Sequence, residues 1–178
     1  MFDENEIKRR TSILLGKALW RCTRAANMAM FDFGERKKII DSKGAEKETG
    51  EVALHVQCAW RIASSDRIIV GSRDLQYPAD YSEDREVPDE FDWDRHPNRQ
   101  DKLVRLLFAD GTKQFMVQNI EVGAVGRFRA VLSGELSLEL FPDDSLPLEH
   151  WRLFLPHVHQ PHLVVTGRDS RDLDHEPD

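Results

Sequence analysis

Apolar and polar side chains alternate through residues 51–62 of the chain. The apolar members stand at every second position: Val52, Leu54, Val56, Cys58, Trp60 and Ile62. Successive strand side chains point to opposite faces, so this period of two predicts one long strand with one apolar face. Residues 64–66 (SSD) supply turn chemistry, and residues 67–72 (RIIVGS) predict the returning strand of a hairpin. The remaining chain must then cover the apolar face of this hairpin.

A helix is predicted near the N-terminus, over about residues 4–15. Asp3 is suited to the N-cap position, and Glu6 follows three residues later, as in a capping box. Gly16 is suited to the position just after the helix.

A second helix is predicted to begin after Asn98, with an end near residues 110–111. Its apolar side consists of Leu103, Leu106 and Leu107. We expect this side to lie against Trp60 in the middle of the long strand, because it is the longest apolar helical stripe in the sequence.

Further strands are predicted from alternation and from flanking turn residues. They cover residues 27–33, 113–122, 127–132, 136–141, 151–155 and 163–166. With the hairpin, this makes about eight strands and two helices. The predicted fold class is α+β, with a mostly antiparallel sheet.

Three segments lack a strand or helix pattern. Residues 17–26 show no clear period, and residues 34–50 are so charged and glycine-rich that a mobile connection is expected. The end of the chain is acidic and aperiodic. We therefore expect a single α+β domain over residues 1–167 and an acidic C-terminal tail over residues 168–178.

Composition and charge narrow the function classes. The 178 residues are 40% hydrophobic, enough for one domain with a sizeable core. Two cysteines are too few for a disulfide framework, and neither a signal peptide nor a membrane-spanning stretch is evident, so a cytoplasmic protein is expected. The net charge is −7, and residues 51–178 carry 24 acidic against 14 basic side chains. Such a surface does not suit nucleic-acid binding.

A long acidic segment over residues 77–97 predicts a surface loop. It contains three prolines, and eight acidic residues fall between positions 80 and 94. Aromatic side chains within a charged loop are typical anchors of protein interfaces. The predicted partner-binding residues are Tyr81, Asp89, Glu90, Phe91, Asp92, Trp93 and Asp94. A protein partner or a second copy of the chain is expected, with no membrane and no nucleic acid.

A histidine-rich loop is the strongest metal candidate. His157, His159 and His162 are three imidazoles within six residues, a donor set that suits zinc or nickel. The alternative is an ordinary surface loop, because no cysteine pair, HExxH helix or suitably spaced carboxylate accompanies them. No cofactor is otherwise expected.

Catalytic candidates are weak. His55 and Arg61 share the polar face of the predicted long strand, and His55 could act as a general base if that face lined a cleft. Cys58 is on the apolar face, where a reactive thiol is not expected. His150 lies near Asp143, Asp144 and Ser145, but residues so close in sequence rarely form a catalytic triad.

Three segments carry a resemblance to a family. They are residues 16–20 (GKALW), 53–62 (ALHVQCAWRI) and 141–154 (FPDDSLPLEHWRLF). Together they resemble a family of small uncharacterised bacterial proteins. The resemblance implies a single bacterial domain and assigns no catalytic residue. By analogy of size and acidity, it also suggests an immunity-like protein.

Two hypotheses follow from the sequence. The first is a non-enzymatic binding or regulatory module that acts through the acidic loop and the sheet surface. The alternative is a metal-assisted hydrolase that uses the histidine-rich loop. The absence of a catalytic motif favours the first.

Overall fold

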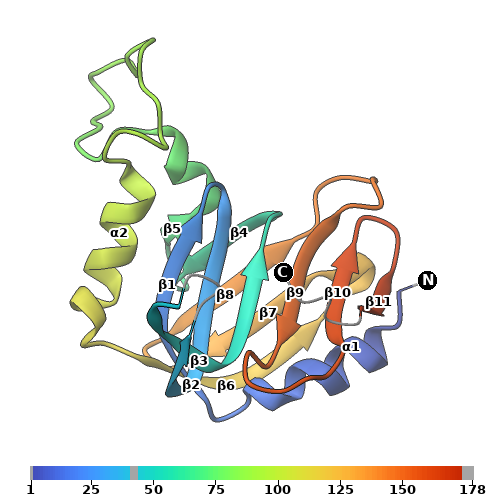
Figure 1. The fold of residues 1–178 in the computed structure, drawn as a ribbon. Coiled ribbons are helices and arrows are strands. Elements are labelled where there is room, and N and C mark those ends of the chain that lie inside the picture. The colour runs from blue at the N-terminus through green and yellow to red at the C-terminus, as the bar shows by residue number, and fades with distance from the viewer. Residues whose placement is uncertain (1, 41–43, 174–178) are drawn as a thin grey trace.

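A computed structural model describes residues 2–40 and 44–173. Within these residues the chain forms one sheet of eleven strands with two α-helices and four short 3₁₀ segments (Figure 1). The helices are α1 (Glu4–Thr11) and α2 (Arg99–Leu107). The strands are β1 (Ala18–Ala25), β2 (Met28–Ile40), β3 (Glu46–Val56), β4 (Ala59–Ala63), β5 (Ile68–Gly71), β6 (Phe115–Val122), β7 (Phe128–Leu132), β8 (Leu136–Phe141), β9 (Glu149–Phe154), β10 (His162–Thr166) and β11 (Ser170–Leu173).

The sheet is antiparallel at every pair of neighbouring strands, in the order β11-β10-β9-β3-β2-β1-β6-β7-β8-β4-β5. The predicted α+β class with antiparallel strands and two helices is confirmed, whereas the predicted number of about eight strands is too low.

The sheet curls so that its two halves enclose the core. Phe31 of β2 meets Trp60 of β4 edge to face, with ring centroids 5.1 Å apart. Phe128 of β7 likewise lies 5.8 Å from Trp151 of β9, although five strand positions separate these strands along the sheet. The fully buried side chains of both halves form one continuous cluster.

The predicted long strand over residues 51–62 is wrong in one respect, because the chain turns a corner in its middle. The N–H groups of Gln57 and Cys58 both donate to the carbonyl of His150, at 2.7 and 3.1 Å. Residues before this corner form β3 in one half of the sheet, and residues after it form β4 in the other. The alternation continues across the corner because both strands face the same core.

The prediction of a mobile connection over residues 34–50 is also wrong for the described part. Strands β2 and β3 continue outward as a two-stranded arm, in which Lys38 pairs with Glu46 at 2.6 Å and Arg36 pairs with Glu48 at 3.7 Å. Cross-strand charge pairs stabilise such a ladder without an apolar face. Periodicity of hydrophobic residues therefore could not reveal it. Residues 41–43 lie outside the described residues.

Strand β1 had no clear sequence pattern because a bulge interrupts its alternation. The pairing with β2 shifts register between Leu19 and Arg21, and both Leu19 and Trp20 are buried. A bulge adds one residue to a strand and re-aims a side chain.

At the C-terminal end, residues 170–173 form β11, which pairs with β10 at the edge of the sheet. The predicted acidic tail, residues 168–178, thus includes this strand. Residues 174–178 lie outside the described part of the chain.

Helix α2 has the predicted cap but not the predicted contact surface. Asn98 accepts a hydrogen bond from the N–H of Asp101 at 2.9 Å, as an N-cap should. Leu103 and Leu107 pack against the core, but Leu106 is 62% exposed, so its assignment to the buried side is wrong. The helix lies beside β5 and the 3₁₀ turn at Ser72–Gln76 instead of covering the middle of the sheet (Figure 1).

Candidate binding site in the acidic loop

The acidic loop, residues 77–97, leaves the body of the protein between β5 and α2 and is closed at its neck by backbone hydrogen bonds. The N–H of Arg99 donates to the carbonyl of Tyr77 at 2.8 Å, and the N–H of Ala79 donates to that of Pro97 at 3.0 Å. Between them Pro78 and Asn98 form an isolated antiparallel bridge. The loop is therefore fixed where it joins the fold, and its sequence contains no strand or helix, as predicted.

Inside the loop, residues 88–96 fold into consecutive turns. The N–H of Phe91 donates to the carbonyl of Pro88 at 2.9 Å, and the N–H of His96 donates to that of Asp92 at 2.8 Å. The Asp92 N–H in turn donates to Nδ1 of His96 at 3.1 Å. These local bonds hold the ring of Phe91 beside that of His96, with centroids 6.1 Å apart and a stacked geometry.

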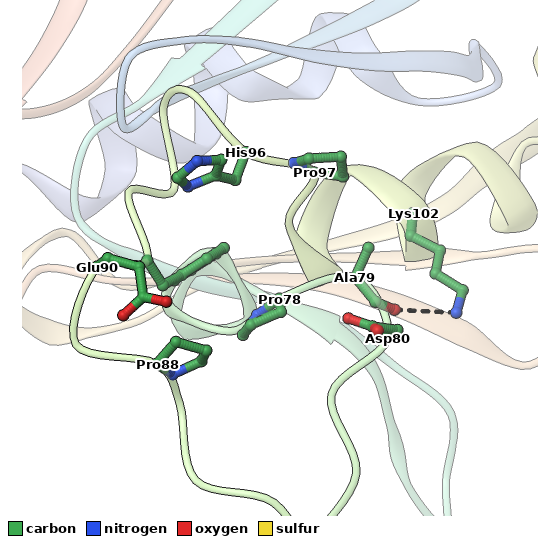
Figure 2. A pocket seen from close by; sticks show the side chains of 9 residues that line it. Pro78, Ala79, Asp80, Pro88, Glu90, His96, Pro97 and Lys102 are labelled. Carbon is green, nitrogen blue, oxygen red and sulfur yellow. Dashed lines mark hydrogen bonds between the residues drawn. The ribbon is translucent and has the colours of Figure 1, made fainter.

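An open cavity of about 650 Å³, which we call the loop pocket, lies between the acidic loop and the start of α2. Prolines and Phe91 supply its apolar surface, and Asp80 and Glu90 supply carboxylates; its lining is Pro78, Ala79, Asp80, Pro88, Glu90, Phe91, His96, Pro97 and Lys102 (Figure 2). In Figure 2, Glu90 and Asp80 stand on opposite sides of Pro78. A cavity of this size lies in the range of natural ligand sites.

The charge of the loop pocket is dominated by carboxylates. Lys102 of α2 reaches the rim, but its Nζ donates to the carbonyl of Ala79 at 2.9 Å (Figure 2). The surrounding segment, residues 80–94, contains eight acidic residues and the single base Arg85. Several like charges around one concave surface focus a negative potential there and favour a cationic ligand.

Arg24 of β1 joins the loop to the body. Its guanidinium lies 3.0 Å from carboxylate oxygens of both Asp94 and Asp101, and its Cζ lies 5.6 Å from the centroid of the Trp93 ring. The side chain of Arg24 is 17% exposed. Trp93 and Asp94 are consequently turned toward the body, away from the loop pocket.

The structure thus divides the seven predicted partner-binding residues. Glu90 and Phe91 line the loop pocket, whereas Trp93 and Asp94 contact Arg24. Tyr81 packs on Tyr77, with centroids 4.7 Å apart. Asp89 is exposed, and Asp92 makes hydrogen bonds within the turns.

Most of the pocket lining was not predicted from the sequence. The sequence marks Pro78, Pro88 and Pro97 as points of rigid backbone, but their spacing does not indicate that they come together. The positions of Lys102 and Asp80 were not predictable either, because their meeting depends on how α2 lies against the loop neck.

The predicted metal residues gather at one end of the β9–β10 connection. His157, His159 and His162 line a common cavity of about 320 Å³ with Phe154 and Ile39. His162 is buried and stacks on Phe154, with centroids 4.5 Å apart, whereas His157 and His159 are exposed. Across the described ranges, no three His, Cys, Asp or Glu side chains are grouped to hold a metal ion. The zinc or nickel prediction gains no support from this arrangement and remains a prediction.

The weak catalytic pair His55 and Arg61 lies on two different strands, on either side of the corner. Arg61 of β4 forms an ion pair with Glu139 at 2.7 Å. His55 of β3 is partly buried edge-on against Phe154, and burial together with the nearby charge of Arg152 lowers its pKa to about 4. Both side chains are therefore engaged in the sheet.

Neither cysteine offers a reactive thiol. Cys22 and Cys58 are free and buried. Burial raises the pKa of Cys58 to about 12 and also raises that of Cys22, which keeps both thiols protonated at neutral pH.

His150 is a buried residue whose environment the sequence did not reveal. It is 3% exposed, and its Nδ1 and Nε2 lie 3.7 and 3.4 Å from carboxylate oxygens of Asp143 and Asp144. Its backbone carbonyl receives the two N–H groups at the corner between β3 and β4. The backbone of His150 therefore holds the corner between β3 and β4 in place.

Comparisons with protein-family models, curated proteins and solved structures found no match to this chain. The described part of the chain contains no helix long and apolar enough to span a membrane. The function of the protein must therefore be inferred from the geometry of the sites themselves.

Proposed function

We propose that this protein is a non-enzymatic binding module whose acidic loop captures a basic segment of a partner protein. The observation that carries the proposal is the loop pocket, a preformed cavity with apolar walls and two carboxylates in its lining. Lysine and arginine side chains combine an apolar stem with a cationic end. One such side chain would place its stem against Phe91 and the prolines, and its charge near Asp80 and Glu90.

Two further features support a partner of this kind. The acidic segment around the pocket attracts a positively charged chain over a distance near the Debye length, about 8 Å at physiological ionic strength. The closed loop neck and the Arg24 contacts hold the binding surface in place before the partner arrives. Preorganisation of this kind lowers the entropic cost of binding.

The experiment measures fluorescence anisotropy of a labelled short peptide that is rich in arginine and glycine, with an acidic peptide of equal length as comparison. We expect saturable binding of the basic peptide only, weakening as salt is raised. Phe91→Ala should weaken binding about tenfold, since interface aromatic residues are often worth more than 1 kcal/mol. Glu90→Gln should weaken it several-fold.

Glu86→Gln is the matched control, because Glu86 lies in the same acidic loop, is exposed and does not line the pocket. It removes the same charge and should change the affinity little. Equal losses for Glu86→Gln and Glu90→Gln would show that the net charge of the loop, and not the pocket, attracts the peptide. No saturable binding of the basic peptide would reject the proposal.

A further inference from the structure

A second cavity, of about 320 Å³, lies between α2 and the sheet at strands β1 to β3. We call it the arginine cleft. Its charged lining includes Arg21, Arg36 and Arg105, and its apolar lining includes Trp20, Val104 and Phe108. It thus differs in character from the loop pocket, which is lined by carboxylates and prolines.

Two guanidinium groups of the cleft lie against the ring of Trp20. The Cζ atoms of Arg21 and Arg36 are 4.6 and 4.5 Å from the ring centroid. The bulge in β1 sets Trp20 beside Arg21 on the sheet, and β2 brings Arg36 to the same ring. The indole N–H of Trp20 is buried and donates to no acceptor in the described residues.

Both guanidinium groups are oriented by the protein. Nε of Arg21 donates to Oδ2 of the buried Asp32 at 2.7 Å, and Nη2 donates to the backbone carbonyl of Glu48. Nη2 of Arg36 donates to the carbonyl of Gly111 at 3.0 Å, and Nη1 lies 3.7 Å from a carboxylate oxygen of Glu48. Each guanidinium has five N–H donors, so these contacts leave donors of both groups uncommitted.

Basic side chains outnumber acidic ones in the lining of the cleft. The lining contains Arg21, Arg36 and Arg105 and one carboxylate, that of Glu48, whereas Asp32 pairs with Arg21 from behind the lining. Guanidinium groups bind carboxylates in a planar, bidentate geometry. An anion with no apolar part would leave the side of the cleft formed by Val104 and Phe108 unused.

We infer that the arginine cleft binds a small organic carboxylate. The carboxylate group accepts hydrogen bonds from Arg21 and Arg36, and the apolar body of the ligand lies against Val104 and Phe108. The cleft volume lies at the lower end of the range for small-molecule sites, which suits a ligand with a single ring or a short branched chain. This inference is independent of the function proposed for the acidic loop.

The test uses benzoate as the probe, titrated into the whole protein by calorimetry, with the side-chain Nε–H signals of the arginines followed by NMR. We expect saturable heat and shifts of the Arg21 and Arg36 signals. Benzyl alcohol, which lacks the charge, should not bind. Inorganic phosphate, which has charge but no apolar part, should bind at least tenfold more weakly than benzoate.

Arg36→Gln should weaken benzoate binding about tenfold, because it removes a charge-assisted hydrogen bond. The side chain of Arg36 is 48% exposed, so Arg36→Gln should fold. Arg105→Gln, on the exposed side of α2, is a second variant that changes an arginine of the same cleft. The matched control is Arg129→Gln, whose side chain is 35% exposed and lies on β7 against Glu121. An unchanged affinity in Arg36→Gln, an equal loss in Arg129→Gln, or no saturable response to benzoate would overturn the inference.

Discussion

Nη1 of Arg24 lies 3.0 Å from Oδ1 of Asp94, and this ion pair joins strand β1 to the C-terminal part of the acidic loop. The same guanidinium contacts Asp101 at the first turn of α2 and the carbonyl of Trp93. Strand β1 thus meets the end of the acidic loop and the start of α2, both of which lie much later in the chain, on one side chain. The Arg24 side chain is 17% exposed, whereas those of Asp94 and Asp101 are 60% and 50% exposed, so solvent partly screens both ion pairs.

Arg24→Gln should loosen the acidic loop without unfolding the sheet. The backbone amides of Phe91 and His96, which donate within the loop, should exchange with deuterium several-fold faster, because the turns lose their anchor. Amides of β2 and β3 should keep their protection. Arg95→Gln is the control, since Arg95 is 83% exposed and pairs with its neighbour Asp92. Equal exchange in parent and Arg24→Gln would show that the loop neck alone holds the loop.

Much of the fold followed from hydrophobic alternation, because most strands have one face toward the core. The strands at residues 128–132 and 136–141 lie within a residue of their predicted bounds, and the caps at Asp3 and Asn98 were recognised from side-chain chemistry. Hydrophobic alternation did not predict the strands that form for other reasons. The arm of β2 and β3 is held by charge pairs, and β1 is interrupted by the bulge at Trp20.

The corner at Gln57 and Cys58 shows a different limit of sequence reasoning. Alternation reports which side chains face the core, but it does not report whether two consecutive segments share one strand. The deciding contact is the carbonyl of His150, which lies more than ninety positions later in the chain. The lining of the loop pocket could not be predicted for the same reason, because it comes from both ends of the loop and from α2.

The partly buried imidazole of His55 should make stability depend on pH. In the folded protein its pKa is lowered to about 4 from the ordinary value of 6.5, chiefly by burial and then by Arg152. At pH values between these two pKa values, the imidazole of His55 binds a proton in the unfolded chain but not in the folded chain. The free energy of unfolding should therefore fall as pH decreases from 6.5 toward 4, by at most about 3 kcal/mol from this residue.

Urea unfolding at several pH values checks this contribution. His55→Phe keeps an aromatic ring beside Phe154 but cannot titrate, so its loss of stability between pH 6.5 and pH 4 should be smaller than that of the parent. His157→Gln, in an exposed loop, should behave as the parent does. If His55→Phe and the parent lose stability equally over this window, His55 is protonated in the folded state.

The two thiols should be unreactive in the native protein. Cys22 and Cys58 are 7% and 5% exposed, and their raised pKa values keep the nucleophilic thiolate scarce. A disulfide exchange reagent such as dithionitrobenzoate should release almost no chromophore from the folded protein and two equivalents after denaturation. Ser65→Cys, in the exposed turn before β5, should add one rapidly reacting thiol. Fast reaction of the parent would contradict the burial of these residues.

Two buried tryptophans differ in one hydrogen bond and should respond differently to the same substitution. Trp60 and Trp151 are 3% and 0% exposed, and both pack against a phenylalanine ring across the core. Nε1 of Trp151 donates to the carbonyl of Gly126 at 2.9 Å, whereas Nε1 of Trp60 has no acceptor in the described residues. Replacement by phenylalanine removes apolar area at both sites but breaks a hydrogen bond only at Trp151.

Trp151→Phe should therefore lower the free energy of unfolding by about 1–2 kcal/mol more than Trp60→Phe does, because it leaves a buried carbonyl unsatisfied. Truncation to alanine should cost about 3–5 kcal/mol at either site. The measurement is the denaturation midpoint, with the slope of the transition checked to be equal among the variants. Equal losses for the two phenylalanine variants would mean that Gly126 finds another donor, and a parent-like midpoint for Trp60→Ala would place that ring outside the core.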